Sequence, residues 1–418
     1  MTEENKNNFD VLVIGGGPAG IIAAIRAGQM GASVAILEKN EALGNKLLLT
    51  GGRRCNITNT SFDTKELAKQ YGKEGDFMLH ALSIFGVKET IEFFNKNGLK
   101  TKIEKDGRVF PKSDKANDIL KILIYFLRNN EVTVLTNSEV KEIKFKGKKI
   151  TKVILKDNRE FTAKNYIITT GGMSLPFTGS TGDGYKFAEK LGHKIEKLKP
   201  ALAPIVMKEH WVKEIQGLSL PNAKLDFFID KKKSFSITGE IIFTHFGLSG
   251  PAILNISQKV GELLEKGEVK IVLDLNPELD LQGLDKILLD YFARNINKSL
   301  KNCLANLLPP KLIPAIIELS KTDPLKKVNE ITKEERFRLI EVLKKFEMTP
   351  TGLLGFDEAM VTSGGISLKE IDAKTMKSKI IDNLFFAGEI INLNGSTGGY
   401  NLQLCWSTGY LAGQTSAK

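Results

Sequence analysis

The chain has 418 residues, of which 42% are hydrophobic, and its formal net charge is +11. This length allows a large buried core and indicates two or three domains. No apolar run is long enough to span a membrane, and the polar start "MTEENKNNFD" does not resemble a secretory signal. The three cysteines and four scattered histidines match no disulfide or metal-ligand spacing. We expect a cytoplasmic protein that binds no membrane and no metal.

The positive charge raises the question of nucleic-acid binding. Only nine of the 60 basic residues are arginines, and the lysines are spread along the whole chain. Because bidentate contacts to phosphates and bases favour arginine, the charge indicates a lysine-rich surface. We therefore expect a small-molecule substrate and no nucleic-acid partner, while the oligomeric state stays open.

The first motif lies in residues 10–40. An apolar run, Val11–Ile14, is typical of a buried parallel strand. Three glycines, Gly15, Gly17 and Gly20, follow in G-x-G-x-x-G spacing, then a helix of small residues at 19–28, and then a second apolar run that ends in Glu38.

This βαβ pattern predicts a dinucleotide site. The glycines let the backbone approach a pyrophosphate, and a helix N-terminus supplies free N–H groups. Glu38 is placed to bind a ribose diol and to repel a 2′-phosphate, which favours FAD or NAD over NADP. A tight strand–helix turn without any ligand is the alternative.

The next 130 residues alternate between helical and strand patterns. Residues 65–99 show a helical pattern. An amphipathic helix follows, with apolar residues at Ile119, Ile122, Leu123 and Phe126. Residues 131–169 predict short strands that end on a buried one, Tyr166–Thr169.

The composition changes near Lys199. Residues 199–277 are β-rich and residues 278–348 are helical. A strand before Gly388 and a helix led by Gly398 then return to the opening pattern. We expect an α/β domain made of residues 1–198 and 349–418, interrupted by an inserted domain at 199–348.

Two more strand ends help to identify the dinucleotide. Thr170, Gly171 and Gly172 follow one apolar strand, and Gly388 and Glu389 follow another. Bound FAD is long and needs several such strand ends along one crevice, whereas a dissociable NAD needs fewer. The pattern favours FAD.

Several longer segments, taken together, resemble the HI0933-like family of FAD-dependent oxidoreductases, whose described members include bile-acid steroid reductases and aminoacetone oxidases. These segments are "GGGPAG", "LEKN", "GNKLLLTGGRRCNITN", "GRVFPKSDKA", "TTGG", "GSTGDGYKFAEKLGH", "THFGLSGPAILNIS", "VTSGGISLKEID", "TMKSK" and "FAGEIINLNGSTGGYNLQ". The resemblance covers nearly the whole chain. It implies an α/β fold with a Rossmann-like FAD-binding domain of glutathione-reductase type, interrupted by a β-barrel-like plus helical domain.

The resemblance also implies roles for individual residues. It places Gly15, Gly17, Pro18, Ala19 and Gly20 on the pyrophosphate, Glu38 and Lys39 at the adenosine ribose, and the main chain of Val140 on the adenine. It assigns Lys46, Arg54, Cys55 and Asn56 to the flavin side, and Gly388 and Glu389 to the ribityl chain. Further candidate cofactor-binding residues are Gly52, Arg53, Thr170, Gly171 and Gly172. The last helix begins near Gly398, Gly399, Asn401 and Leu402, and its dipole would stabilise negative charge on reduced flavin.

The sequence departs from the family in two places. Arg53 stands where the family has a small residue, and Asn392 and Asn394 stand where it often has acids. These changes add positive charge. We expect either a more easily reduced flavin or a preference for an acidic substrate.

Two other side chains have two readings each, and two more have one. His245 is the candidate proton donor, although a histidine that structures its loop through backbone hydrogen bonds is the favoured reading. Cys55 has no partner cysteine, so lining the flavin pocket is favoured over redox chemistry. His193 and Cys405 are expected to be structural.

The resemblance favours a flavoenzyme that reduces an activated C=C bond, of the enone type, with hydride from NAD(P)H through FAD. Only one G-x-G-x-x-G lies between a strand and a helix, so NAD(P)H would bind as a dissociable donor. The alternatives are an oxidase of a small amine or ketone, a tRNA-modifying flavoprotein, and a non-catalytic flavin sensor.

Overall fold

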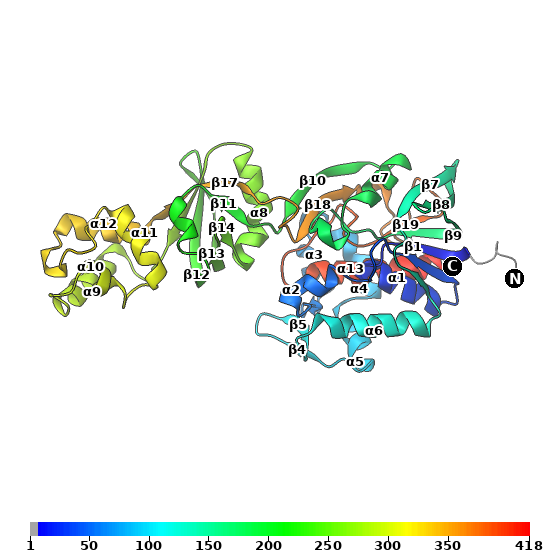
Figure 1. Ribbon diagram of the computed structural model, residues 1–418, viewed down its shortest axis with the longest axis horizontal. Coiled ribbons are helices and arrows are strands. Elements are labelled where there is room, and N and C mark those ends of the chain that lie inside the picture. The colour runs from blue at the N-terminus through cyan, green and yellow to red at the C-terminus, as the bar shows by residue number, and fades with distance from the viewer. Residues whose placement is uncertain (1–6) are drawn as a thin grey trace. The chain divides into compact units, whose positions relative to one another are not determined.

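The computed structural model describes residues 7–418 (Figure 1). The chain divides into two units, of which the second, Leu202–Gly355, interrupts the first. The first unit runs up to Ala201 and resumes at Phe356–Lys418. The sequence suggested an insert at 199–348, so the observed boundaries lie three and seven residues further along the chain.

The first unit contains a seven-stranded sheet with strand order β6-β2-β1-β9-β8-β7, and β19 pairs with β9. Strands β6, β2, β1, β9 and β19 are parallel, and β7 and β8 join them through antiparallel pairs. The strands are β1 (Asn8–Ile14), β2 (Val34–Leu37), β6 (Thr133–Leu135), β7 (Val140–Lys146), β8 (Lys149–Leu155), β9 (Glu160–Ile168) and β19 (Leu384–Phe386).

Four of these strands end at the same level. Ile14 of β1 pairs with Leu37 of β2 and with Ile168 of β9, which in turn pairs with Phe386 of β19. The residues that follow each strand therefore meet at one edge of the sheet. In doubly wound α/β folds this edge is where ligands bind.

Two helices pack closely beside this edge, α1 (Pro18–Gln29) and α13 (Tyr400–Ser416). A Cβ on Gly409 would lie 2.4 Å from the carbonyl oxygen of Ala19, and one on Gly413 would lie 2.2 Å from that of Ala23. The glycines of "STGYLAGQ" thus let α13 lie against the backbone of α1. This packing places the start of the last helix near the first motif.

The region expected to be helical at residues 65–99 is helical and consists of several short helices. The helical segments break at residues 70–71 and 85–86, and Gly72–Met78 between them forms a 3-10 helix. The remaining elements of the first unit are α2 (Thr50–Arg53), β3 (Thr58–Asn59), α3 (Thr64–Lys69), α4 (Leu79–Ile84), α5 (Val87–Lys96), β4 (Thr101–Ile103), β5 (Arg108–Pro111), α6 (Ala116–Asn129), α7 (Asp183–Lys190), β10 (Ile195–Ala201) and β18 (Val361–Ile366).

The second unit is built on a seven-stranded antiparallel sheet with the order β16-β15-β12-β13-β14-β11-β17. Its own core of buried apolar residues is separate from that of the first unit. The strands are β11 (Ile205–Met207), β12 (Ser219–Ile229), β13 (Lys232–Phe243), β14 (Gly247–Ser249), β15 (Val269–Asp274), β16 (Phe346–Met348) and β17 (Pro350–Leu353). The helices are α8 (Pro251–Leu264), α9 (Leu281–Ala293), α10 (Leu300–Leu304), α11 (Ile313–Ser320) and α12 (Lys333–Lys344). Within residues 7–418, no helix combines the length and apolar character that a membrane crossing requires.

Candidate functional site

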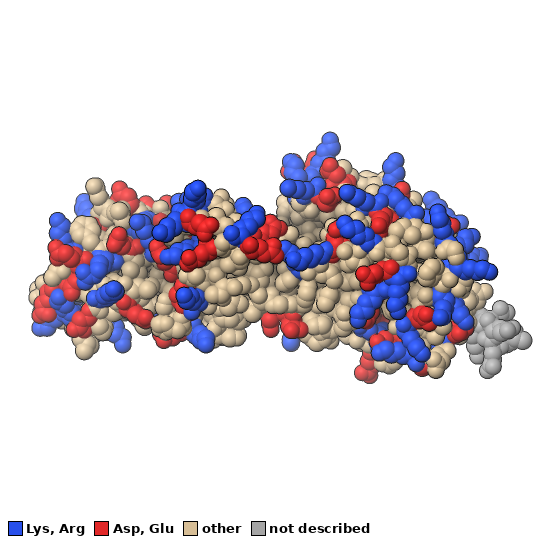
Figure 2. Space-filling model, turned by 90° about the horizontal axis from the view of Figure 1, so that it is seen from above, with Lys and Arg blue, Asp and Glu red and all other residues tan. Residues whose placement is uncertain are grey.

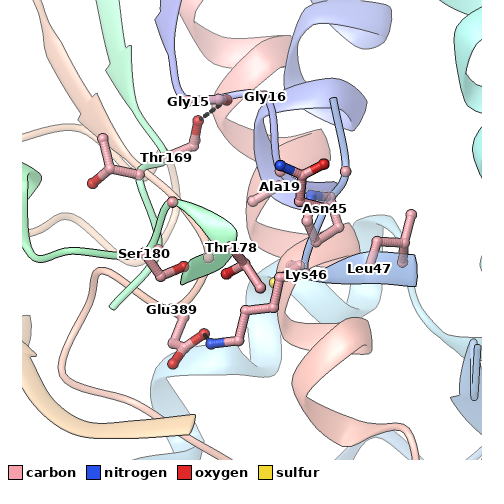
Figure 3. A pocket seen from close by; sticks show the side chains of 18 of the residues that line it. Gly15, Gly16, Ala19, Asn45, Lys46, Leu47, Thr169, Thr178, Ser180 and Glu389 are labelled. Carbon is pink, nitrogen blue, oxygen red and sulfur yellow. Dashed lines mark hydrogen bonds and ion pairs between the residues drawn. The ribbon is translucent and has the colours of Figure 1, made fainter. Parts of the chain in front are cut away.

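A cavity opens at the edge where β1, β2, β9 and β19 end, and all the residues that line it belong to the first unit. Its walls come from segments far apart in the sequence, at 14–19, 37–50, 138–140, 169–187, 360–361 and 388–405. Figure 3 shows the Lys46 side chain extending to Glu389, with Gly15, Gly16 and Thr169 at another wall. The cavity lining therefore includes both the first motif and the start of the last helix.

The turn between β1 and α1 leaves room for a ligand. Gly15 has φ of 108°, and a Cβ there would lie 2.7 Å from the carbonyl oxygen of Thr169. A Cβ on Gly17 would meet no atom within 4 Å, so the backbone at Gly17 faces open space. Helix α1 begins directly after Gly17 with no side-chain cap and no acidic residue in its first turn. Its first N–H groups suit a phosphate, as the motif predicts.

Glu38 lies at the end of β2 and is buried. One carboxylate oxygen, Oε1, accepts hydrogen bonds from the backbone N–H and side-chain amide of Asn40, both at 2.8 Å. The other, Oε2, accepts one bond from the Gly16 N–H at 2.7 Å. Oε2 therefore keeps capacity for a further donor, such as a ribose hydroxyl.

The loop before α7 forms a second wall near Glu38. The Asn40 amide donates to the carbonyl of Thr178 at 3.1 Å, and Lys39 forms an ion pair with Asp183 at 2.6 Å. Burial opposes ionisation of Asp183, but the hydrogen bonds from Lys39 and Thr181 outweigh it and lower the pKa of that carboxyl. Lys39 thus holds the loop to the rim of the cavity.

The other end of the cavity carries a polar cluster of Lys46, Ser174, Thr362 and Glu389. The Lys46 ammonium donates to Ser174 Oγ at 2.6 Å and to Glu389 Oε2 at 2.8 Å. Glu389 Oε1 accepts from the Thr362 N–H at 2.8 Å and from Ser174 Oγ at 2.9 Å. The third N–H of Lys46 has no partner among residues 7–418, so a cationic donor remains available at the cavity wall.

The beginning of α13 meets the same cavity through Asn401 and Leu402. The Asn401 amide is already used, because it accepts from the Gly395 N–H at 2.8 Å and donates to the carbonyls of Gly395 and Ser396. Asn401 therefore shapes the loop before the helix. Gly398 and Gly399 both have positive φ, and a Cβ on Gly399 would lie 2.6 Å from the backbone of Thr58. They let this loop pass over β3.

The segment "TGGRRCN" is a strained turn beside the cavity. Gly51, Gly52, Arg53 and Cys55 all have φ between 56° and 68°. Thr50 lines the cavity, but residues 51–56 do not.

The side chains of Arg53, Arg54 and Cys55 in that turn have different surroundings. Arg54 pairs with Glu104 and, at 2.7 Å, with Asp114, and its guanidinium lies over the Phe110 ring. Cys55 is fully buried in the core, and burial raises its thiol pKa to about 12, so the thiolate is not available. Arg53 is exposed and makes no ion pair with a described residue.

The structure brings together fourteen of the residues named from the sequence. The cavity is lined by Gly15, Gly17, Pro18, Ala19, Glu38, Lys39, Lys46, Val140, Thr170, Gly171, Gly388, Glu389, Asn401 and Leu402. Nine others in the first unit do not line it: Gly20, Gly52, Arg53, Arg54, Cys55, Asn56, Gly172, Gly398 and Gly399. Gly20 instead allows close packing, because a Cβ there would lie 2.0 Å from the carbonyl of Gly15. A direct contact of these nine with a cofactor stays a prediction.

Sequence reasoning missed other cavity residues. Cys405 was expected only in the core, yet it lines the cavity, and Met360 lies there with it. Thr178, Ser180 and Asp183 also line it. The motif "GSTGDGYKFAEKLGH" contained the last two of these three, but nothing in its spacing showed which side chains face the ligand.

The two histidines differ. His193 is buried, its Nδ1 bonds Glu370 at 3.1 Å and its Nε2 bonds Ser378 at 2.9 Å. Burial lowers the pKa of His193, although Glu370 opposes this, so the ring is a structural bridge as expected. His245 belongs to the second unit, is exposed, and contacts the Phe246 ring without any hydrogen bond to a described residue. The expected backbone bond of His245 is therefore absent from residues 7–418.

The cavity residues fit FAD. The open space at Gly17, the free start of α1 and the spare capacity of Glu38 suit a nucleotide with a pyrophosphate. The hydroxyl of Thr170 is buried at the cavity without a partner, which is an unsatisfied polar atom that a polar ligand would satisfy. The Lys46–Glu389 cluster offers charge and hydrogen bonds at the far end.

Comparisons with known proteins identify the family. The family model described as the HI0933-like protein Rossmann domain matches residues 9–415. The chain is 34% identical over 409 residues to the 3-dehydro-bile acid delta(4,6)-reductase of Clostridium scindens, covering 97% of this chain and 98% of the relative. It is 30% identical over 418 residues to the ribosomal RNA dihydrouridine synthase of Escherichia coli, covering 97% of each chain.

Solved structures share the fold. The 3-ketosteroid delta1-dehydrogenase of Sterolibacterium denitrificans matches with a TM-score of 0.53 and 14% identity, covering 99% of this chain and all of the other. An open conformation of a flavocytochrome c3 fumarate reductase matches with a TM-score of 0.53 and 16% identity, covering 99% of this chain and 78% of the other. With the family match over nearly the whole length, these findings show that the chain belongs to the HI0933-like family and is an FAD-dependent oxidoreductase.

Proposed function

We propose that the protein reduces a carbon–carbon double bond conjugated to a carbonyl group, with hydride from NADH or NADPH delivered through bound FAD. The observation that carries this proposal is a reaction class common to two full-length relatives. A delta(4,6)-reductase acting on a 3-dehydro bile acid saturates a bond conjugated to a ketone. A dihydrouridine synthase saturates the uracil bond that is conjugated to a ring carbonyl.

The cavity supports this reaction class through its charge. When bound, FAD supplies a two-electron carrier that accepts and donates hydride. Gly15, Gly17 and the start of α1 would hold its pyrophosphate, and Glu38 would bind the ribose. At the other end Lys46, held by Glu389 and Ser174, would donate its remaining N–H to the flavin and would help to stabilise the negative charge of the reduced ring.

A dissociable nicotinamide nucleotide would supply the hydride. The chain has one G-x-G-x-x-G between a strand and a helix, so a nicotinamide nucleotide would use the same access route as the substrate. An oxidase that acts on a small amine or ketone and passes hydride to oxygen is the alternative direction. Both directions need the same cofactor site.

Ribosomal RNA is the second candidate substrate, beside a small enone. It is favoured by a specific observation, namely that relatives named ribosomal RNA dihydrouridine synthases from Escherichia coli and Haemophilus influenzae align over 96% or more of this chain. The net charge of +11 also suits a polyanion. These two facts oppose the expectation, based on the scarcity of arginine, that the protein has no nucleic-acid partner.

One anaerobic experiment separates the candidates. The FAD-loaded protein is mixed with NADH or NADPH and bleaching of the flavin absorbance is followed. The reduced protein then receives a delta4-3-ketosteroid, or ribosomal RNA transcribed in vitro without modified bases. We expect reoxidation by one of them, with a product that has gained two hydrogen atoms by mass spectrometry.

The controls define the other outcomes. Bleaching by a small amine or ketone, followed by reoxidation with oxygen, would identify an oxidase and contradict the proposal. Failure of every donor to bleach the flavin would favour a binding protein. The variant Lys39→Met, which changes a charge at the adenosine end, is expected to keep the same preference between the steroid and the RNA.

A further inference from the structure

One cluster of exposed lysines lies outside the cofactor cavity, on the turn between β7 and β8. Residues 144–149, with the sequence Lys-Phe-Lys-Gly-Lys-Lys, are all exposed. Across the two strands Lys144 pairs with Lys152, and Lys146 pairs with Lys149. Like charges directly opposite each other destabilise a strand pair. The arrangement therefore weakens the isolated hairpin and favours a negatively charged partner.

The charges at the base of the hairpin are compensated, whereas those at its tip are not. Lys144 pairs with Glu142, and Lys152 pairs with Glu160, both at 2.8 Å. No described residue forms an ion pair with Lys146, Lys148 or Lys149. Lys190 adds positive charge near Glu142. The exposed Asp382 is an acid beside the turn, since its N–H donates to the Lys148 carbonyl at 2.7 Å.

An aromatic ring lies among these lysines. Phe145 is 47% exposed, although its partner across the strands, Ile150, is buried. The pairing register shifts between Lys144 and Phe145, and residues 144, 145 and 146 are all exposed. An exposed ring flanked by cations is the combination on which single-stranded bases stack while their phosphates are neutralised.

The hairpin is held firmly at its base, so its tip is preorganised. The Asn383 side chain accepts from the Ile150 N–H at 2.9 Å and donates to the Ile150 carbonyl at 3.0 Å. Gly147 takes the left-handed conformation of the turn, with φ of 59° and no atom near its missing Cβ. Substitutions at 145, 146 and 149 therefore change the surface without disturbing packed neighbours.

We propose that the 144–149 turn is an RNA-binding surface, where Lys146, Lys148 and Lys149 contact phosphates and Phe145 stacks on a base. This inference rests on the second candidate substrate of the proposed function. Single-stranded RNA is favoured over an anionic membrane, because one aromatic ring among four lysines offers too little apolar area to enter a bilayer. Over the face shown in Figure 2, basic and acidic side chains are interspersed, so the net charge alone does not make a general polyanion surface.

The test uses the FAD-loaded full chain and a labelled 30-nucleotide single-stranded RNA of mixed sequence, with anisotropy measured from low to moderate KCl. The double variant K146E/K149E is expected to weaken binding at least tenfold. It should also reduce the slope of log affinity against log salt by about 1.4, because each phosphate contact on a single strand contributes about 0.7. Phe145→Ser should weaken binding about fivefold or more with an unchanged slope.

A matched control is the other lysine-rich turn, between β12 and β13. Lys231 and Lys232 are exposed there, but Asp230 adjoins them and Lys232 pairs with Ile229 rather than with another lysine. The variant K231E/K232E carries the same charge change and should keep RNA affinity within about twofold. K146Q/K149Q tests the lost contacts without introducing acids and should give about half the effect.

The remaining outcomes each overturn the inference. Equal losses in the two turns would indicate a general charge effect, and unchanged binding in K146E/K149E would place RNA elsewhere. Binding of the turn to phosphatidylserine vesicles in place of RNA would identify a membrane contact. If the unmodified protein binds no RNA, both the turn and the RNA candidate are wrong, whereas steroid-enone reduction would still support the small-molecule candidate.

Discussion

The two ends of the cofactor cavity are built in different ways. The nucleotide end comes mainly from one contiguous βαβ segment, in which Gly15, Gly17 and Glu38 lie within 24 residues. The opposite end joins Lys46, Ser174, Thr362 and Glu389, and the ion-paired Lys46 and Glu389 are 343 residues apart. Local sequence therefore defines one end, and tertiary packing defines the other.

The comparison extends to the two lysine–carboxylate pairs on the cavity. Lys39–Asp183 is 24% and 31% exposed and closes a loop at the rim. Lys46–Glu389 is 19% and 15% exposed, and its carboxylate also takes hydrogen bonds from Ser174 and Thr362. The first pair is partly exposed to water, whereas the second belongs to a hydrogen-bonded network of four residues. Such networks lose more when one member is removed.

The largest effect is expected from a substitution of Gly17, at the nucleotide end of the cavity, on FAD affinity. Gly17→Asp has room for its side chain and provides a good N-cap for α1, so the apoprotein should be as stable as before or slightly more stable. Its carboxylate would repel a pyrophosphate. Two charges 4 Å apart at an effective dielectric of about 20 interact by about 4 kcal/mol, so FAD affinity should fall about a thousandfold.

FAD titration and thermal melting of the apoprotein measure these two effects separately. Gly17→Ser is the uncharged control and should bind FAD nearly normally. If the Asp and Ser variants bind FAD equally well, the pyrophosphate does not lie at Gly17.

The next largest effects are expected from removing the carboxylates of Glu389 and Asp183, one at a time. Glu389→Ala leaves Lys46 and the Thr362 N–H without their acceptor and should lower the free energy of unfolding by about 3 kcal/mol. Asp183→Ala should lower it by about 1 kcal/mol or less, because that pair is more exposed. Urea unfolding of the apoproteins measures both. Equal losses would show that the two pairs are not distinct in kind, and Lys46→Met in the Glu389→Ala background should recover part of the loss.

Outside the cavity, His193 bridges Glu370 and Ser378, and its effect on stability should depend on pH. Because burial lowers the pKa of His193 in the folded protein, the unfolded chain binds the proton more readily. The neutral ring's contribution is complete above the usual histidine pKa of about 6.5. It is lost as the pH falls through the lower folded-state pKa.

Unfolding free energies at pH 7 and pH 5.5 therefore form the measurement. The unmodified protein should lose more stability between these values than His193→Gln does. Ser378→Ala keeps the histidine and should retain the pH dependence. A larger loss in His193→Gln would contradict a neutral buried ring.

The smallest effect concerns the adjacent arginines of the strained turn. Arg53→Gly removes an exposed side chain from a left-handed residue, so stability should rise by up to about 1 kcal/mol with unchanged FAD affinity. Arg54→Ala instead removes contacts with Glu104, Asp114 and Phe110 and should cost about 1–2 kcal/mol. Thermal melting and FAD titration test the pair. A lower FAD affinity in Arg53→Gly would contradict this prediction and would indicate that Arg53 contacts FAD, as its position in the motif suggests.

Much of the fold was readable because its signals are local. The first strand, the helix at 19–28 and the acid at Glu38 follow from apolar runs and glycine spacing, and the structure places them as expected. The helical pattern at 65–99 was also confirmed, although the structure divides it into short helices. A change in composition predicted an inserted unit at 199–348, and the structure divides the chain at Leu202–Gly355.

The sequence by itself determined the family, the FAD chemistry and the nucleotide end of the site, because a strand, a glycine turn and a helix are encoded within a short segment. Only the tertiary structure decided which side chains of "TGGRRCN" turn away from the cavity, and that Cys405 lines it. It also decided that Lys46 meets Glu389 and that lysines face each other across the β7–β8 hairpin. These features depend on side-chain direction and strand register between distant segments, and neither quantity is written in the spacing of residues along the chain.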